Sequence, residues 1–296
     1  MTKRSTRFPA GTCLLLWAAL AVLSPPAARA DFKQQHIGAR PMALGSAYVA
    51  LADDANAVYW NPAGLTRLAT PMIMGTRTRL FTSDINNDYV AVGVPGRLLS
   101  FGASWVRLGI DNIYSEDTIN LAVAAKAPWL KGLSVGIAGK LFLLDAPGYV
   151  QYDDPNYLGG DHDFSFDLGW LYDKGGNWTL GGTFYNVLSP KLQLISTTTD
   201  PDPVYSEWVL GGSYLFRETL LATADLRSRE GELNNMVINW GAEIWFFNTL
   251  ALRAGMAEGK VTLGAGLQDA HWRLGLALET NNKLGDIYEI SFTLRK

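Results

Sequence analysis

The sequence predicts an all-β protein, a transmembrane antiparallel β-barrel of about 14 strands with an N-terminal helical plug. Three observations lead to this fold class. From Pro71 to the end, apolar and polar residues alternate with the period of two that a β-strand imposes. The alternating segments have roughly the 9 to 11 residues that a tilted strand needs to cross a bilayer. The connections between them alternate between short and long, as in outer-membrane barrels.

Residues 1–30 fit a signal peptide, because a basic start, an apolar run from Cys13 to Leu23 and the sequence Ala28-Arg29-Ala30 follow in the required order. Its removal takes away four of the 25 basic residues and none of the 28 acidic ones, which leaves a net charge of about −7. Cys13 is the only cysteine, so the remaining chain forms no disulfide and holds no metal through a thiolate. An acidic balance without clustered basic residues argues against nucleic acid as a partner.

Residues 31–69 are expected to form a plug inside a barrel of residues 70–296. The stretch from Arg40 to Ala55 is rich in Ala, Leu and Met and does not alternate, which predicts a helix. Asp53 and Asp54 are expected to end this helix and to anchor the plug.

The rest of the plug is expected to pack against the lumen wall and then turn. Tyr59 and Trp60 supply apolar contact surface. Asn61-Pro62-Ala63-Gly64 combines the residues that favour a tight turn. This turn is expected to send the chain into the first strand.

Fourteen segments have the strand pattern, roughly 71–82, 86–95, 98–110, 116–128, 132–145, 163–173, 177–186, 205–216, 219–229, 235–247, 249–256, 260–268, 270–280 and 286–295. A count of twelve is the alternative, if two weak strands pair outside the barrel. With both termini in the periplasm, short connections such as Pro95-Gly96-Arg97 lie on that side. The long ones, Asp145–His162 and Val187–Val204, then lie on the outer side.

Each strand is expected to turn its apolar face to lipid and its polar face to the lumen. The inward face carries charges of both signs that can pair across the lumen: Lys140, Asp167, Asp225, Arg227, Glu243, Arg253, Arg273, Glu279 and Glu289. Asp53 and Asp54 could pair with lumen arginines such as Arg253 or Arg273, but the favoured interpretation is that they end the helix and anchor the plug, rather than contact a substrate directly. Glycines on the same face leave room for the plug: Gly102, Gly136, Gly169, Gly181, Gly211, Gly241 and Gly275.

The stretch GARPMALGSAYVALADDANAVYWNPAGL, from Gly38 to Leu65, resembles the N-terminal signature of FadL-type hydrophobic-compound channels and their smaller PorV/PorQ-type relatives. The resemblance implies an inserted plug and a barrel of fourteen strands. The chain length and modest outer loops are more similar to the PorV/PorQ-type branch. Two features depart from the pattern. The chain ends Phe292-Thr293-Leu294-Arg295-Lys296 without the usual terminal aromatic residue, and no long ligand-capturing outer hairpin can be identified.

For function, the resemblance implies passive uptake of small hydrophobic molecules such as long-chain fatty acids through the bacterial outer membrane, with no cofactor. The alternative is an accessory barrel of a protein secretion or surface-attachment system, whose outer loops hold a secreted client protein. The expected partners are therefore outer-membrane lipids and either a hydrophobic small molecule or such a client.

Several plug residues are candidates for the ligand path. Apolar contacts are expected from Phe32, Ile37, Met42, Leu44, Tyr59 and Trp60, although static packing of the plug would use the same side chains. The polar and turn positions of the candidate set are Asp53, Asp54, Asn61, Pro62 and Gly64.

Enzymatic activity is not expected. His162 with Ser165 or Asp161 has only the generic spacing of loop residues, which is weak support for a hydrolase triad. The acidic loop from Tyr152 to Asp163 could supply oxygen ligands to calcium, but it lacks a regular calcium-loop spacing. A solvated outer loop is the favoured interpretation, with no metal bound.

Overall fold

The computed structural model describes residue 32 and the segments 37–81, 85–152, 155–196, 201–281 and 285–296. Residues 32–296 form one compact unit. The predicted signal peptide, residues 1–30, lies outside the described residues. Within the part of the chain that is described, none of the helices has both the length and the apolar character needed to cross a membrane.

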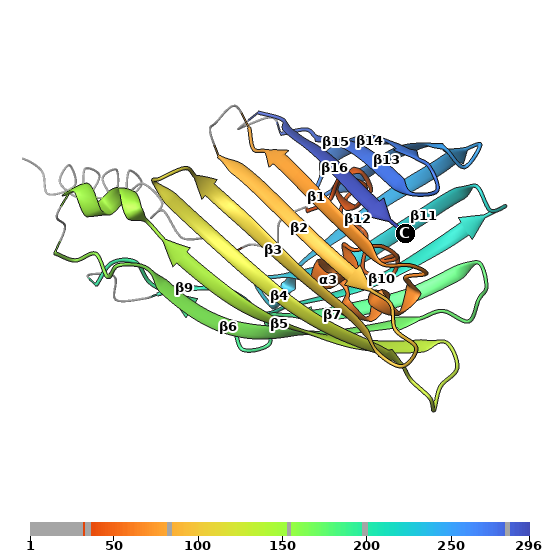
Figure 1. Cartoon of the computed structure of the whole chain (residues 1–296), viewed down its shortest axis with the longest axis horizontal. Coiled ribbons are helices and arrows are strands. Elements are labelled where there is room, and N and C mark those ends of the chain that lie inside the picture. Colours follow the sequence, from red (N-terminus) through yellow and green to blue (C-terminus); the bar gives the residue numbers. More distant parts are fainter. Residues whose placement is uncertain (1–31, 33–36, 82–84, 153–154, 197–200, 282–284) are drawn as a thin grey trace, which may run out of the picture. The chain divides into compact units, whose positions relative to one another are not determined.

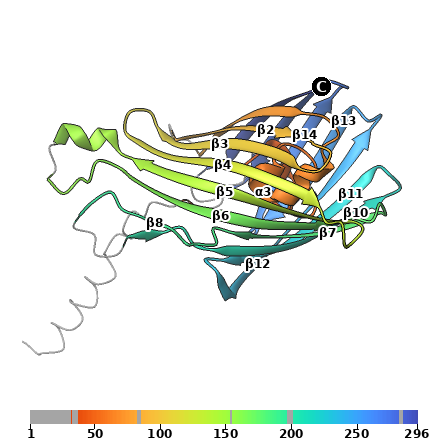
Figure 2. The same cartoon turned by 60° about the horizontal axis from the view of Figure 1, so that its bottom comes forward.

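Fourteen antiparallel strands form a closed barrel, in which consecutive strands are neighbours and β1 pairs with β16 (Figures 1 and 2). The strands are β1 (Met72–Arg79), β2 (Asn86–Val94), β3 (Ser100–Ile110), β4 (Tyr114–Lys126), β5 (Leu133–Asp145), β6 (Asp161–Tyr172), β7 (Trp178–Tyr185), β10 (Glu207–Phe216), β11 (Leu220–Arg229), β12 (Glu232–Phe246), β13 (Leu250–Ala257), β14 (Lys260–Gln268), β15 (Trp272–Glu279) and β16 (Ile287–Arg295).

The predicted fold class and strand count are confirmed, and the twelve-strand alternative is wrong. Two additional short strands, β8 (Lys191–Leu192) and β9 (Asp202–Pro203), pair with each other outside the barrel, in the long connection between β7 and β10. The other long connection contains a 3₁₀ helix, η2 (Pro147–Tyr152). Closure leaves the sheet without an unpaired edge, which is what a barrel in lipid requires.

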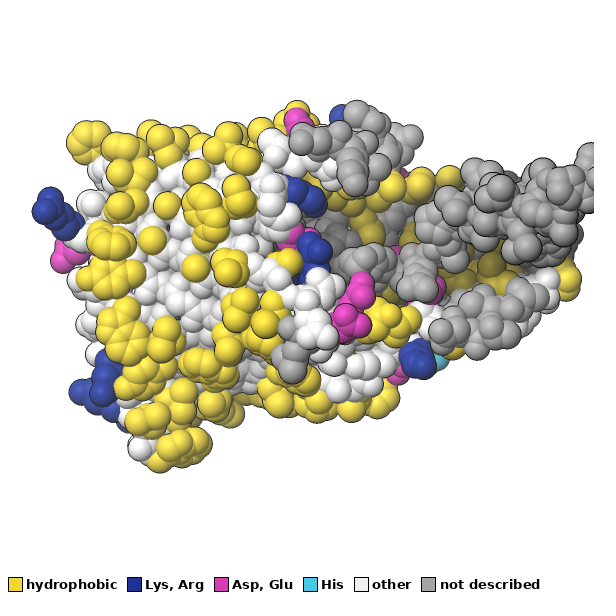
Figure 3. Space-filling model, turned by 180° about the vertical axis from the view of Figure 1, so that it is seen from behind, with side chains coloured by type: hydrophobic (Ala, Val, Ile, Leu, Met, Phe, Trp, Pro, Cys, Tyr) yellow, Lys and Arg dark blue, Asp and Glu magenta, His cyan; other side chains and the backbone are white. Residues whose placement is uncertain are grey.

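The alternation of the sequence becomes an inner and an outer face. In β6, Ser165 and Asp167 are buried inside, while Phe164, Leu168 and Trp170 are exposed outside. Figure 3 shows apolar side chains spread over the barrel wall, with charged side chains gathered toward its two ends. An apolar outer wall of this kind is typical of a barrel that faces lipid.

The segment before β1 is less helical than its composition predicts. It forms α2 (Ala39–Ala43), α3 (Ala57–Trp60) and a 3₁₀ helix, η1 (Pro62–Arg67). The predicted helix over 40–55 is wrong beyond Ala43, because Gly45 and Ser46 adopt φ values of 65° and 61°, which end an α-helix. Asp53 and Asp54 therefore lie between helices and do not end one.

The predicted turn at Asn61 is the start of η1. The Asn61 side chain accepts a hydrogen bond from the Ala63 amide, which caps the 3₁₀ helix, and Pro62 occupies its first position. Leu68 follows in extended conformation and leads the chain toward β1.

Residues 37–68, called the plug below, contact strands on every side of the barrel. Helix α2 packs against β13 to β16, whereas α3 and η1 pack against β2 to β6. Between them, Val49 packs against β7 and β10, and the Thr223 hydroxyl of β11 donates to the Ala47 carbonyl. The plug helix α3 is enclosed by strands in both views (Figures 1 and 2).

The inward glycines allow this close approach. A Cβ atom at Gly136 would lie 2.6 Å from the Ala63 nitrogen, and one at Gly241 would lie 2.4 Å from the Leu44 carbonyl oxygen. Both distances are shorter than van der Waals contact. The room that the sequence left on the inner face is thus occupied by plug backbone.

Replacing Gly241 with alanine is expected to displace the plug and to destabilise the barrel by about 1–3 kcal/mol, the usual cost of overpacking. The matched control is Gly139→Ala, since Gly139 is exposed and an added Cβ would have its nearest neighbour, the Leu121 carbonyl oxygen, at 4.0 Å. The midpoint of guanidinium unfolding in detergent, followed by circular dichroism, measures both. Equal midpoints for the two variants would contradict contact between the plug and β12.

Candidate functional site: the plugged lumen

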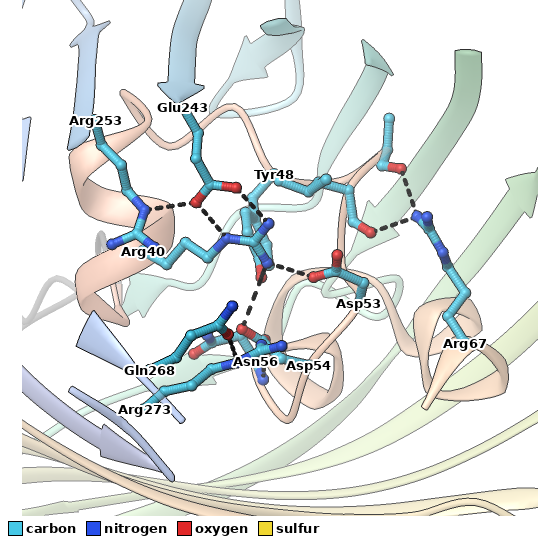
Figure 4. A network of polar contacts seen from close by, with 12 residues as sticks. Arg40, Tyr48, Asp53, Asp54, Asn56, Arg67, Glu243, Arg253, Gln268 and Arg273 are labelled. Carbon is cyan, nitrogen blue, oxygen red and sulfur yellow. Dashed lines mark hydrogen bonds and ion pairs between the residues drawn. The ribbon is translucent and has the colours of Figure 1, made fainter. Parts of the chain in front are cut away.

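A network of charged groups centred on Arg40 joins the plug to β12 and β13 (Figure 4). The Arg40 guanidinium donates to both Glu243 carboxylate oxygens at 2.9 Å, to the Tyr48 hydroxyl at 3.3 Å and to the Asp53 carboxylate. Arg253 donates to the same Glu243 carboxylate at 2.6 Å. Glu243 is 2% exposed, so its charge is compensated almost entirely by these two arginines.

The ion pairs predicted between the plug aspartates and Arg253 or Arg273 are wrong. Asp53 and Asp54 are paired with Arg40 of the plug itself, the second at 3.9 Å. Arg253 is directed to Glu243, and the Arg273 guanidinium donates to the Gln268 side chain at 2.9 Å. The turns after α2 reverse the chain and bring the two aspartates next to Arg40, which therefore pairs with them.

The two aspartates differ in their tendency to ionise. Burial disfavours the charged form of Asp53, but Arg40, Arg67 and Arg273 outweigh burial and lower its pKa. Burial, and then the neighbouring Asp53 carboxylate, raise the pKa of Asp54. Asp53 therefore ionises more readily than Asp54 and is the direct counter-charge of Arg40.

A small cavity of about 40 Å³ adjoins this network, beside Arg40, Asp54, Arg253 and Arg273. It has room for water, whose share of liquid volume is about 30 Å³, but not for a hydrocarbon.

A second polar cluster lies at the other side of the plug, toward the long connections. Lys140 pairs with Asp167 at 2.8 Å and donates to the Asn186 side chain at 3.1 Å. Arg227 pairs with Glu207 at 3.2 Å. Both cations also lie over the Tyr185 ring, at 5.3 Å for the Lys140 nitrogen and 5.8 Å for the Arg227 guanidinium carbon.

Barrel side chains also hold the plug backbone. The Asp225 carboxylate accepts hydrogen bonds from the Tyr48 and Val49 amides at 2.7 and 3.1 Å. The Asn61 side chain donates to the carbonyl of Val49 in the plug and to the carbonyl of Trp170 in β6. The chain is thus fixed in the lumen by directional bonds as well as by packing.

The aromatic residues form a continuous buried row. Tyr48, Trp60, Tyr59 and Tyr89 make successive edge-to-face contacts, with centroid distances of 6.1, 5.8 and 6.1 Å. The Trp60 indole donates to the Ile37 carbonyl at 2.8 Å, and the Trp60 carbonyl accepts from the Tyr185 and Thr183 hydroxyls. The row crosses from the plug to β2, so Tyr59 and Trp60 join the plug to the barrel wall by packing.

The other predicted residues are distributed over the plug and its surroundings. Ile37 and Leu44 belong to the same buried cluster as Trp60, while Met42 packs in a second cluster with Ala277 and Ile287. Phe32 contacts Phe142 edge to face at 5.3 Å. Three more positions complete the set: Pro62 lies against Gly169, Gly64 against Ala52, and Glu279 pairs with Lys260.

Sequence reasoning missed Arg40, Tyr48, Tyr185 and Asn186 as parts of these clusters. One signal was available for Arg40, because it is the only charged residue between Ile37 and Ala52, a stretch otherwise typical of a buried segment. A lone arginine there, followed by two aspartates, indicates a buried ion pair.

The shortest ladder of the barrel lies between β6 and β7. The ladder between β6 and β7 spans only Leu168 to Tyr172, and Tyr185 is opposite Glu207 at the ends of β7 and β10. Beyond this point β6 continues to Asp161, and the connection after β7 covers it, with the Val187 amide donating to the Phe166 carbonyl. The cluster of Lys140 and Arg227 lies at these ends of β7 and β10.

Two carboxylates of the acidic outer loop bind the neighbouring connection. Asp161 and Asp163 accept hydrogen bonds from the backbone amides of Gln193 and Lys191, which ties the β8 connection to β6. Asp153 and Asp154 lie outside the described residues. Among the residues with described positions, His, Cys, Asp and Glu form no group of three suited to a metal ion.

Several solved barrels have the same architecture over nearly their whole length. The CymD monoaromatic hydrocarbon channel aligns at a TM-score of 0.62 and 14% identity, over 90% of this chain and 99% of its own. The Pseudomonas putida toluene transporter TodX aligns at 0.62 and 14%, over 89% and 99%. A Pseudomonas aeruginosa FadL homologue aligns at 0.56 and 11%, over 87% and 98%.

This chain has the fold of those barrels. Identities of this size establish the fold alone, so the architecture implied by the FadL-type resemblance is confirmed, while the PorV/PorQ-type placement stays a prediction. No family model and no curated protein matches the sequence.

Proposed function

We propose that this protein is a bacterial outer-membrane channel for the passive uptake of small hydrophobic molecules. The observation that carries the proposal is the shared fold: a closed barrel of fourteen strands that aligns, over about nine tenths of its length, with barrels described as hydrocarbon and toluene channels. The apolar outer wall supports the membrane location. Such passage needs no cofactor or energy source.

The path we propose begins at the end of the long connections and reaches the plug. Phe142 and Leu144 of β5 are inward-facing apolar side chains beyond the plug, and Phe32 contacts the first of them. The aromatic row of Tyr59 and Trp60 would be the next apolar surface, exposed when the plug shifts. Long-chain fatty acids are the finer proposal, in which Lys140 or Arg227 would receive the carboxylate near Tyr185.

One observation favours the alternative, an accessory barrel of a secretion or surface-attachment system. The plug contacts strands around the barrel and is held by buried ion pairs, which suits a permanently closed lumen. In that case the connections after β5 and β7 would hold a client protein.

Uptake into liposomes separates the two functions. The purified barrel is reconstituted, and entry of toluene and of a fluorescent long-chain fatty acid is followed beside a version that lacks residues 31–61. Uptake by the intact protein, altered by the deletion, supports a channel gated by the plug. Leakage of small polar solutes from the truncated form, without any uptake by the intact form, would overturn the channel proposal and favour the accessory role.

A further inference from the structure

A groove of about 820 Å³ lies on the outer wall of the barrel, across β14, β15, β16 and β1. The strand register places its lining side chains in two outward rows. Leu263, Leu278 and Tyr288 lie opposite one another in the first row, and Ala265, Leu276 and Ile290 in the second. These positions alternate with buried inward ones, so the groove faces away from the lumen.

Two arginines close the groove at β1. Arg79 continues the row of Tyr288 and Arg77 the row of Ile290. They are two residues apart on one strand and therefore project from the same face. A basic wall beside an apolar floor is unusual on a surface that meets lipid, because arginine at the lipid face of a barrel is costly unless its charge is satisfied.

Among the described residues, Arg77 has an acidic partner and Arg79 has none. Arg77 pairs with Asp88 at 3.5 Å, yet its side chain remains 62% exposed. Asp88 lies opposite Arg107, which pairs with Asp117, so this row already balances its charges from β1 to β4. Arg79 stands outside the row and forms no hydrogen bond or ion pair with any residue that the structure describes. Glu289 also lines the groove, but its buried side chain points inward and accepts a hydrogen bond from the Thr78 hydroxyl. Among the outward side chains that the structure describes, the groove therefore carries an excess positive charge.

We propose that this outer-wall groove binds an acylated lipid with a phosphorylated headgroup. The phosphate would lie between Arg77 and Arg79, because guanidinium groups match phosphate oxygens in geometry and charge. An acyl chain would lie over Ala265, the smallest side chain of the two outward rows, between leucine and isoleucine side chains. The proposal rests on the membrane location given under Proposed function, but it concerns a site outside the transport path.

Binding is tested in detergent by native mass spectrometry with a hexa-acylated, bis-phosphorylated glucosamine disaccharide lipid as the probe. The Arg77→Gln/Arg79→Gln variant is expected to weaken binding at least tenfold, and Ala265→Phe, which fills the groove, to weaken it similarly. The control is Arg97→Gln, since Arg97 is exposed in the turn between β2 and β3, at the opposite end of the strands. It is expected to bind as the unaltered protein does.

Two comparison ligands complete the test. The same lipid without its phosphates is expected to bind at least tenfold more weakly, and inorganic phosphate to compete poorly. Equal binding of the dephosphorylated lipid, full competition by phosphate, or unchanged binding by the double arginine variant would each overturn the proposal. Because no transport is measured, failure here is distinct from failure of the uptake experiment.

Discussion

Replacing Arg40 with methionine is expected to loosen the plug and to raise the leakage of small solutes through the reconstituted barrel. Among the residues with described positions, Arg40 alone bridges Asp53 of the plug and Glu243 of the wall. Without it Asp53 loses its partner and Glu243 keeps only Arg253. Breaking a buried pair on one side costs roughly 3–5 kcal/mol, enough to raise the population of a displaced plug at least a hundredfold.

Release of carboxyfluorescein from liposomes measures this effect. Arg97→Met is the control, because it removes an exposed arginine from a turn without touching the plug. The Arg40→Met/Asp53→Asn double variant removes the orphaned charge and is expected to leak less than Arg40→Met alone. If Arg40→Met leaks no faster than the control variant, the network in Figure 4 does not hold the plug.

Replacing Trp60 with alanine is expected to cost about 3–5 kcal/mol of stability, the range for large aromatic residues removed from a packed core. The side chain is fully buried, contacts Tyr48 and Tyr59, and donates its indole hydrogen to the Ile37 carbonyl. Its loss leaves a cavity where the aromatic row crosses the lumen. The midpoint of guanidinium unfolding in detergent is the measurement.

Two further variants show which part of Trp60 matters. Trp60→Phe keeps most of the packing but leaves the Ile37 carbonyl without its donor, so a smaller loss of about 1–3 kcal/mol is expected. Trp129→Ala removes a tryptophan that is 76% exposed and is expected to change the midpoint little. A midpoint of Trp60→Ala close to that of Trp129→Ala would contradict a packed lumen.

The strands could be predicted from the sequence because their signal is local. The period of two fixes which residues of a segment such as Phe164–Asp173 share a face, whatever the segment pairs with. Gly136 and Gly241 were likewise recognisable as inward positions. Each of these features depends on a few neighbouring residues, and the structure places them as predicted.

The helix over 40–55 was predicted wrongly because amino-acid composition does not show where tertiary packing forces the backbone out of the helical conformation. Ala and Leu favour a helix there, but tertiary packing places Gly45 and Ser46 in left-handed conformations so that the chain can contact β12 and β13. Packing against the wall overrides a propensity of a few tenths of a kcal/mol per residue.

The class of the protein follows from the alternation and composition of its segments: a closed barrel of about fourteen strands with an apolar exterior, a charged interior and a segment to fill it. Which charges form ion pairs depends on the folded arrangement of the chain. Arg40 is far from Glu243 in the chain, and their contact depends on how the plug folds and on the strand register, to which every residue of the barrel contributes. Ion pairs across the lumen form only when the barrel has closed around the plug. The alternation of apolar and polar residues, in contrast, is present within each strand and does not depend on the others.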